Sequence, residues 1–89
     1  MPTKKKAPKI KVFHKDLSDL KRLGQAWQEA RIIDVDADAH QKAKDLLDTY
    51  IHEVIHVALP TLEEEKVDRL AGEITEVLWG RGYRQVKLR

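Results

Sequence analysis

The chain has 89 residues, which suffice for one small domain with a thin core and exclude a protease built from two lobes around a cleft. It contains no cysteine, so disulfides, thiolate metal ligands and a cysteine nucleophile are excluded, and any metal has to be held by histidines and carboxylates. The net charge of +2 conceals a division, because residues 1–15 hold six lysines and no acid, whereas residues 16–89 hold eleven basic and all fifteen acidic side chains. We therefore expect a mildly acidic domain without a nucleic-acid-binding face of its own, preceded by a basic leader.

The leader comes first in the chain. Residues 1–9 are polar and basic and include two prolines, so we expect them to be disordered. Two uses of this leader stay open: a solubilising tail, or an arm that contacts nucleic acid or an acidic partner. No apolar stretch is long enough for a membrane span, and the basic start is not followed by the apolar part of a secretory signal. We therefore expect a cytoplasmic protein with no membrane partner.

A small sheet is expected after the leader. Alternating apolar and polar side chains and β-branched residues indicate strands, and leucines spaced about three residues apart indicate a short helix or turn. Trp27 is expected to pack in the core or at a helix end rather than to stack on a substrate. The expected strands are residues 10–13, 25–29 and 31–36, and the expected helix or turn is residues 17–23, ending at Gly24.

Two helices are expected in the second half of the chain. Residues 39–58 place apolar side chains on one side at helical spacing, with Asp38 as the expected N-cap. Residues 62–79 form a second amphipathic helix, with Thr61 as its expected N-cap. The fold class is therefore α+β: a two- or three-stranded sheet packed against two antiparallel helices. This single domain is expected to span residues 10–83, before a short basic tail of residues 84–89.

The segment His52-Glu53-Val54-Ile55-His56 matches the pattern H-E-x-x-H inside the first helix. Two histidines four residues apart lie one above the other on a helix, so both imidazoles can reach one Zn²⁺ ion. The glutamate between them lies near the same face and can take a proton from water without being a ligand. We predict zinc ligands His52 and His56 and general base Glu53, on a face turned away from the apolar stripe. Two solvated surface histidines, or a zinc site without catalysis, stay open as alternatives.

A catalytic zinc site needs a third protein ligand. Three carboxylates stand in the first turn of the second helix, which lies at the height of the motif in an antiparallel hairpin. Helical spacing turns Glu65 to solvent and Glu63 and Glu64 toward the first helix. Only Glu64 has an acid four residues later, Asp68, which can accept a hydrogen bond from a ligand histidine. We favour Glu64 as the third ligand and Asp68 as the supporting acid, with Glu63 and Glu65 as alternatives.

On these two motifs the chain resembles the gluzincin family of zinc metallopeptidases, in which H-E-x-x-H is followed on a later helix by E-x-x-x-D, here residues 64–68. In size and element order, residues 10–83 are similar to the minigluzincins, minimal scaffolds with a small sheet, an active-site helix and a glutamate helix. The spacing between the two motifs is shorter than in large gluzincins. The resemblance implies a zincin-like fold that binds Zn²⁺ through His52, His56 and Glu64, with Glu53 as general base and Asp68 as the supporting acid.

The resemblance also implies how a peptide or protein substrate is bound. In such peptidases an edge strand binds the substrate as an added β-strand, and residues 25–29 or 31–35 are the candidates here. Minimal members can be latent, with a terminal segment in the cleft, for which residues 82–89 are the candidate. Larger relatives stabilise the oxyanion with a tyrosine or histidine, and the candidates here are Tyr83, His14 and His40.

The leading hypothesis is a zinc-dependent metallopeptidase, active or latent, in which Glu53 takes a proton from water and delivers it to the leaving amine. The alternative is a non-catalytic binding module. In that case zinc joins the two helices, and the basic leader contacts nucleic acid or an acidic partner.

Overall fold

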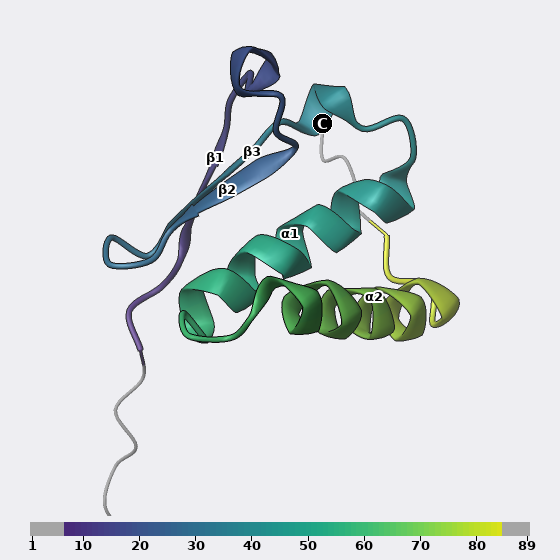
Figure 1. Ribbon diagram of the computed structural model, residues 1–89. Helices are drawn as coiled ribbons and strands as arrows, with labels where there is room; N and C mark the ends of the chain where they lie inside the picture. The colour runs from purple at the N-terminus through teal and green to yellow at the C-terminus, as the bar shows by residue number, and fades with distance from the viewer. Residues whose placement is uncertain (1–6, 85–89) are drawn as a thin grey trace, which may run out of the picture.

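The N-terminal part of the chain forms a three-stranded sheet, and the rest forms a hairpin of two helices that covers one face of it (Figure 1). The computed structural model describes residues 7–84, so the leader expected at residues 1–9 and the tail expected at residues 84–89 lie mostly outside the described residues. The predicted α+β fold class is confirmed, with three strands in the sheet. The main elements are β1 (Lys11–His14), β2 (Gly24–Trp27), β3 (Ile32–Val35), α1 (Ala43–Ala58) and α2 (Glu64–Gly80).

Strand β3 is the centre of the sheet. It pairs in parallel with β1 and antiparallel with β2, so the strand order is β1-β3-β2. Its β-branched side chains suit a strand with a neighbour on each side, and Ile33 and Val35 are fully buried against the helical layer. Strand β2 is an edge strand, because within residues 7–84 only one of its edges pairs with another strand. Its second edge runs beside α1 and borders the site described below.

Helix α1 lies between the sheet and α2 and packs on both (Figure 1). Val57 packs on the buried residues of β3, whereas Ile55 packs on Val67 and Ala71 of α2. The helix therefore has two apolar faces. Helical spacing places the polar strip with the H-E-x-x-H motif on the side away from the core, but this strip lies between the two apolar faces. Glu53, on that strip, is only 8% exposed. Across residues 7–84, no helix combines the length and the apolar content that a membrane crossing requires.

The starts of both helices differ from their predictions. Asp38, the expected N-cap of α1, belongs to a short 3-10 helix (Ala37–Ala39) that is followed by His40, and α1 begins only at Ala43. The expected N-cap of α2, Thr61, is also wrong. The carbonyl of Glu63 accepts the first helical hydrogen bond, from the N–H of Val67 at 2.9 Å, so α2 begins two residues later than expected.

Two residues near β2 also differ from expectation. Gly24 does not end the preceding turn but is the first residue of β2. Trp27 does not enter the core, because its side chain lies at the edge of the sheet and is 52% exposed. Its indole N–H is nevertheless bonded, to a carboxylate oxygen of Asp34 at 2.7 Å. A hydrogen bond to a carboxylate thus holds at the sheet edge an aromatic side chain whose apolar character would favour the core.

Candidate metal centre

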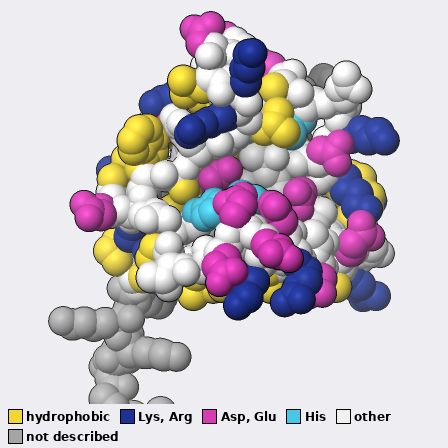
Figure 2. All heavy atoms as spheres, viewed as in Figure 1, with side chains coloured by type: hydrophobic (Ala, Val, Ile, Leu, Met, Phe, Trp, Pro, Cys, Tyr) yellow, Lys and Arg dark blue, Asp and Glu magenta, His cyan; other side chains and the backbone are white. Residues whose placement is uncertain are grey.

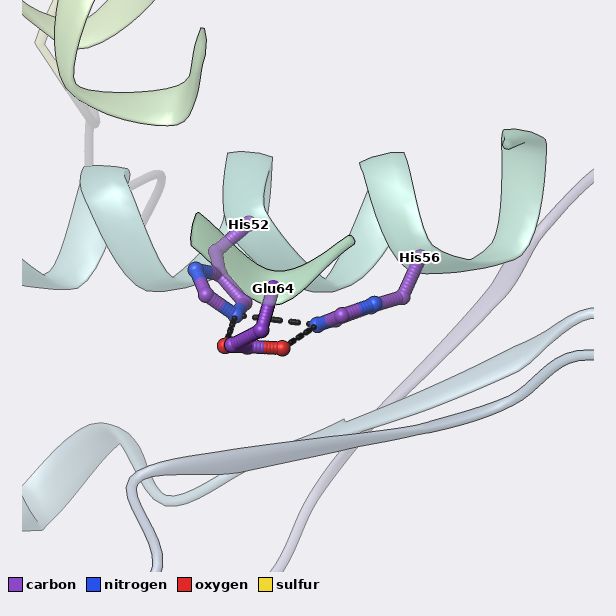
Figure 3. Close-up of side chains that lie close together, drawn as sticks. All are labelled: His52, His56 and Glu64. Atoms are coloured by element: carbon purple, nitrogen blue, oxygen red, sulfur yellow. Dashed lines mark hydrogen bonds and ion pairs between the residues drawn. The ribbon is translucent and has the colours of Figure 1, made fainter. Parts of the chain in front are cut away.

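Three side chains that can ligate a metal meet between α1 and α2 (Figure 3). The two oxygens of Glu64 lie 2.8 Å from Nε2 of His52 and 2.8 Å from Nε2 of His56, and the two nitrogens are 3.0 Å apart. Each residue thus offers one ligand atom, and these atoms all lie within 4.8 Å of one another. The group is the one that the two sequence motifs indicate. Neither Glu63 nor Glu65 belongs to it.

Local structure explains how these ligand atoms meet. The two histidines stand one helical turn apart on α1, and their ring centroids are 4.7 Å apart. The short connection after α1 reverses the chain, and Glu64 is the first residue of α2. Its carboxylate therefore lies beside the last turns of α1. Both imidazoles project toward the side on which the sheet strands lie (Figure 3).

The ligand atoms of this group carry lone pairs that a bound cation would stabilise. A carboxylate oxygen only accepts hydrogen bonds, and a neutral imidazole carries a single N–H. His52 meets a carboxylate with each of its ring nitrogens: Nδ1 lies 3.1 Å from Asp68 Oδ1, and Nε2 lies 2.8 Å from Glu64. Once the Nδ1 proton is donated to Asp68, Nε2 presents a lone pair to the lone pairs of Glu64 and His56. These repel unless a proton or a metal ion lies among them.

The size of the group is also compatible with zinc. Imidazole nitrogens and carboxylate oxygens bind zinc at about 2.0–2.2 Å, which places tetrahedral ligand atoms about 3.3 Å apart. The ligand atoms here are separated by 2.8 to 3.0 Å along the three closest contacts. Small outward rotations of the side chains therefore suffice to admit an ion. Glu64 is free to make such a movement, because its side chain is 62% exposed.

Glu53 lies between the two histidines in sequence but is not in the ligand group. It is buried under the first residue of β2. A β-carbon built on Gly24 would lie 3.0 Å from both Cγ and Oε2 of Glu53. Burial raises the pKa of the Glu53 carboxyl above its ordinary value, and the nearby Glu64 adds to this, whereas His52, His56 and Arg22 oppose it. The carboxyl group is thus a candidate proton acceptor in a partly dehydrated place.

An open cavity of about 410 Å³ joins the ligand group to Glu53. Its floor is formed by the two histidines, Glu53 and Glu64, and one wall is the edge strand, residues 24–28. Arg22, just before that strand, adds a cationic side chain to the lining. Acidic side chains gather around the histidines on this face of the molecule (Figure 2). The cavity thus combines an edge strand, a group of metal-ligand type and a buried carboxylate.

The other histidines and the predicted tyrosine are not brought to this cavity. His14 bonds to the hydroxyl of Tyr50 instead. His40 joins the carbonyl of Asp36 to the hydroxyl of Thr49, at 2.8 and 2.7 Å. Tyr83 lines a separate, mostly apolar cavity formed with both helices. None of the three candidates for oxyanion stabilisation lines the cavity of the ligand group.

One of the two candidate strands for substrate binding does not have a free edge. Residues 31–35 are largely the central strand β3, with both edges paired, so this alternative for the substrate-binding strand is wrong. The candidate for a latency segment, residues 82–89, lies mostly outside the described residues.

Sequence patterns did not reveal Arg22 and Gly24 as parts of the site. Both stand at the junction of a turn and a strand, and neither belongs to a motif. The available signal was a glycine that opens the strand next to the helix with the candidate metal ligands, which indicates close approach of two backbones.

Comparisons with known proteins found no matching family model, no matching curated protein and no matching solved structure.

Proposed function

We propose that the chain is a zinc-dependent peptidase with a zincin-like site of the minigluzincin kind. The observation that carries this proposal is the convergence of His52, His56 and Glu64 beside the buried carboxyl of Glu53. The resemblance of the two motifs to gluzincins supports zinc as the metal and a peptide bond as the target.

Each residue of the site has a distinct proposed role. His52, His56 and Glu64 would hold the metal, and Asp68 would fix the ring of His52 by accepting its Nδ1–H. A bound Zn²⁺ would supply Lewis acidity, polarising a peptide carbonyl and acidifying water. Glu53 would accept a proton from the attacking water and deliver it to the leaving amine. The upward shift of its pKa brings this carboxyl closer to the pH range in which it can both accept and donate a proton.

The edge of β2 is the proposed place for the substrate. An extended peptide can add to a free strand edge through main-chain hydrogen bonds. Residues 24–28 line the cavity and lie alongside the motif residues of α1, so a peptide on this edge would carry one carbonyl past the ligand group. The expected substrate-binding segment, residues 25–29, coincides with this edge far better than residues 31–35.

Metal content and peptide cleavage test the proposal together. Zinc-reconstituted protein is expected to hold one zinc ion per chain and to cleave members of a mixed peptide library. His52→Ala is expected to lose both properties, whereas Glu53→Gln is expected to keep the zinc and lose cleavage. His14→Ala serves as the control, since His14 bonds to Tyr50 outside the cavity. Cleavage by Glu53→Gln at the rate of the unchanged protein would contradict the proposed general base.

A second candidate function is supported by the position of the ligand group. The proposed ligands come from both α1 and α2, so a metal would also join the two helices. In the non-catalytic alternative, zinc raises the melting temperature and no peptide of the library is cleaved. The same zinc-loaded samples decide between the two functions.

A further inference from the structure

The face of the sheet turned away from α1 carries two exposed aromatic rings. Because Ile33 and Val35 of β3 are buried against the helical layer, the alternate residue Asp34 belongs to the opposite face. Phe13 of β1 is its register partner, and Trp27 of β2, which bonds to it, lies on that face as well. The two residues are 46% and 52% exposed. We call this surface the outer face.

Trp27 is held in a fixed orientation. Its indole N–H donates to Oδ2 of Asp34 at 2.7 Å, and the same oxygen accepts a hydrogen bond from the side chain of Gln25 at 2.9 Å. Asp34 itself is fully buried beneath these side chains. A buried carboxylate is costly unless it is bonded, and its position here orients a ring that remains open to solvent. An aromatic side chain held in this way loses little conformational freedom when a flat ligand stacks on it.

Cationic side chains lie on the same face as Phe13. Strand alternation places Lys11 on the same face as Phe13. Lys15 extends over that face, with its Nζ atom 5.9 Å from the centroid of the Phe13 ring and 3.5 Å from Asp34. The guanidinium of Arg31 donates to the carbonyl of Pro8 at 2.8 Å and so holds the segment before β1 against the sheet. Residues 1–15 hold six lysines and no acid, so this charge continues along the chain.

We propose that the outer face binds single-stranded nucleic acid. Strand spacing and register place the two aromatic residues roughly 12 Å apart, one on each side of β3, so that two bases of one strand can stack on them. Base stacking on aromatic side chains and lysine contacts to phosphates together form the usual platform for single strands. A double helix keeps its bases stacked internally and cannot use both rings. This proposal departs from the expectation that the domain has no nucleic-acid-binding face and that only the leader contacts nucleic acid, because it adds a surface formed by β1 and β2.

The outer face is distinct from the candidate metal centre in charge. Acidic side chains surround the histidines on the face shown in Figure 2, whereas the outer face presents Lys11 and Lys15 on the side of the sheet that carries Phe13. A single-stranded nucleic acid is favoured over an acidic protein segment, because its bases can stack on the exposed rings. Acidic side chains would interact only with the lysines. Trp27 also lines the cavity of the ligand group, whereas Phe13, Lys11 and Lys15 do not, so binding that depends on these three residues and needs no metal is distinguishable from the proposed peptidase activity.

Fluorescence anisotropy of the full chain with a labelled oligothymidylate, in EDTA and at low ionic strength, tests this binding. Phe13→Leu is expected to weaken binding roughly tenfold, whereas Phe13→Tyr is expected to bind as tightly as the unchanged protein. Lys11→Gln is expected to reduce the salt dependence of log K by about 0.7. Tyr83→Leu is the matched control, because Tyr83 is an exposed aromatic that lines a cavity outside the outer face.

A second measurement reports on Trp27 directly. The chain has two tryptophans, so Trp79→Phe leaves Trp27 as the only one, and its fluorescence is expected to be quenched by the oligonucleotide. Equal binding by Phe13→Leu and Phe13→Tyr, both folded by circular dichroism, would overturn the proposal. Duplex DNA or polyglutamate that competes as well as the single strand would overturn it too. If Phe13→Leu does not fold, absence of Trp27 quenching in the Trp79→Phe protein is the overturning result.

Discussion

Gly24 of β2 lies against Glu53 of α1 so closely that a β-carbon at residue 24 would approach Cγ and Oε2 of Glu53 to 3.0 Å. The same atom would also approach the methyl group of Thr49 to 2.9 Å. These two side chains are buried and cannot move away without displacing β2 or the helix. The absence of a side chain at residue 24 therefore determines where the proposed general base lies.

Gly24→Ala is expected to destabilise the protein by about 1–3 kcal/mol, because it overpacks the contact between β2 and α1. Peptide cleavage is expected to fall further than stability, because Glu53 is displaced. Urea unfolding and peptide cleavage assays measure the two effects. Gly72→Ala is the matched control: nothing lies within 4 Å of its added carbon, and alanine in a helix interior is expected to stabilise by roughly 0.5–1 kcal/mol. Equal responses of the two variants would refute the close contact.

Glu53→Gln is expected to stabilise the metal-free protein at neutral pH. Burial raises the pKa of Glu53 in the folded state, so the folded protein holds this proton more tightly than the unfolded chain. The contribution of Glu53 to stability is therefore fully present below its ordinary pKa and is lost as pH rises through the raised value. Glutamine does not ionise, so the free energy of unfolding of Glu53→Gln does not fall in this way as pH rises.

Urea unfolding in EDTA across the acidic and neutral range measures that difference. The difference in free energy of unfolding should favour Glu53→Gln near neutral pH and become smaller toward acidic pH. Glu65→Gln, at an exposed position outside the ligand group, serves as the control and should show no such trend. A stability difference that stays constant with pH would contradict the burial of Glu53.

Glu64→Gln is expected to lower zinc affinity far more than Glu63→Gln or Glu65→Gln. Only Glu64 of these neighbours contributes an atom to the ligand group. Competition with a chromogenic chelator measures the three affinities under the same conditions. Similar affinities for all three variants would show that the third ligand lies elsewhere.

Asp68→Asn is expected to weaken zinc binding by about 10–100-fold while leaving the fold intact, because a carboxylate that orients a ligand histidine has an effect of this size. Asp68 Oδ1 lies 3.1 Å from Nδ1 of His52, and the side chain is 64% exposed, so its loss creates no buried cavity. The same chelator competition, with circular dichroism as the fold check, measures the effect. Unchanged affinity would remove Asp68 from the site.

Asp34→Asn is expected to destabilise the sheet at neutral pH by about 1–3 kcal/mol. Burial alone would raise the pKa of Asp34, but hydrogen bonds from Trp27 and Gln25, together with Lys15, outweigh it and lower the pKa below its ordinary value. The stabilisation is thus present above the ordinary pKa and is lost as pH falls through the lowered value. Urea unfolding should show a difference that shrinks at acidic pH. A pH-independent difference would indicate a role in packing alone.

The α+β class, the approximate strands and helices, and the proximity of the two motifs could be anticipated from sequence. Helical spacing brings His52 and His56 together without help from the rest of the chain. The antiparallel hairpin then brings Glu64 to them, which periodicity and a short connection already indicate.

The burial of Glu53 could not be anticipated, because it depends on β2 crossing α1 at Gly24, a contact between distant parts of the chain. Helical periodicity showed one apolar face of α1, but the helix packs on two layers, and a polar residue between them is buried by both. The exposure of Trp27 has a similar cause. Its partner Asp34 is brought beside it only when β2 pairs with β3 in the sheet.

The three proposed ligands fall within residues 52–64, whereas the cover over Glu53 comes from residue 24. Closing the short loop between the helices costs little chain entropy, and the pairing of β2 with α1 requires contacts much more distant in sequence. The helical hairpin can therefore gather its ligands before the sheet has docked. During folding, the proposed metal ligands would therefore come together before the proposed general base is covered, and mutations that loosen the sheet are expected to yield a chain that still binds zinc but lacks the proposed peptidase activity.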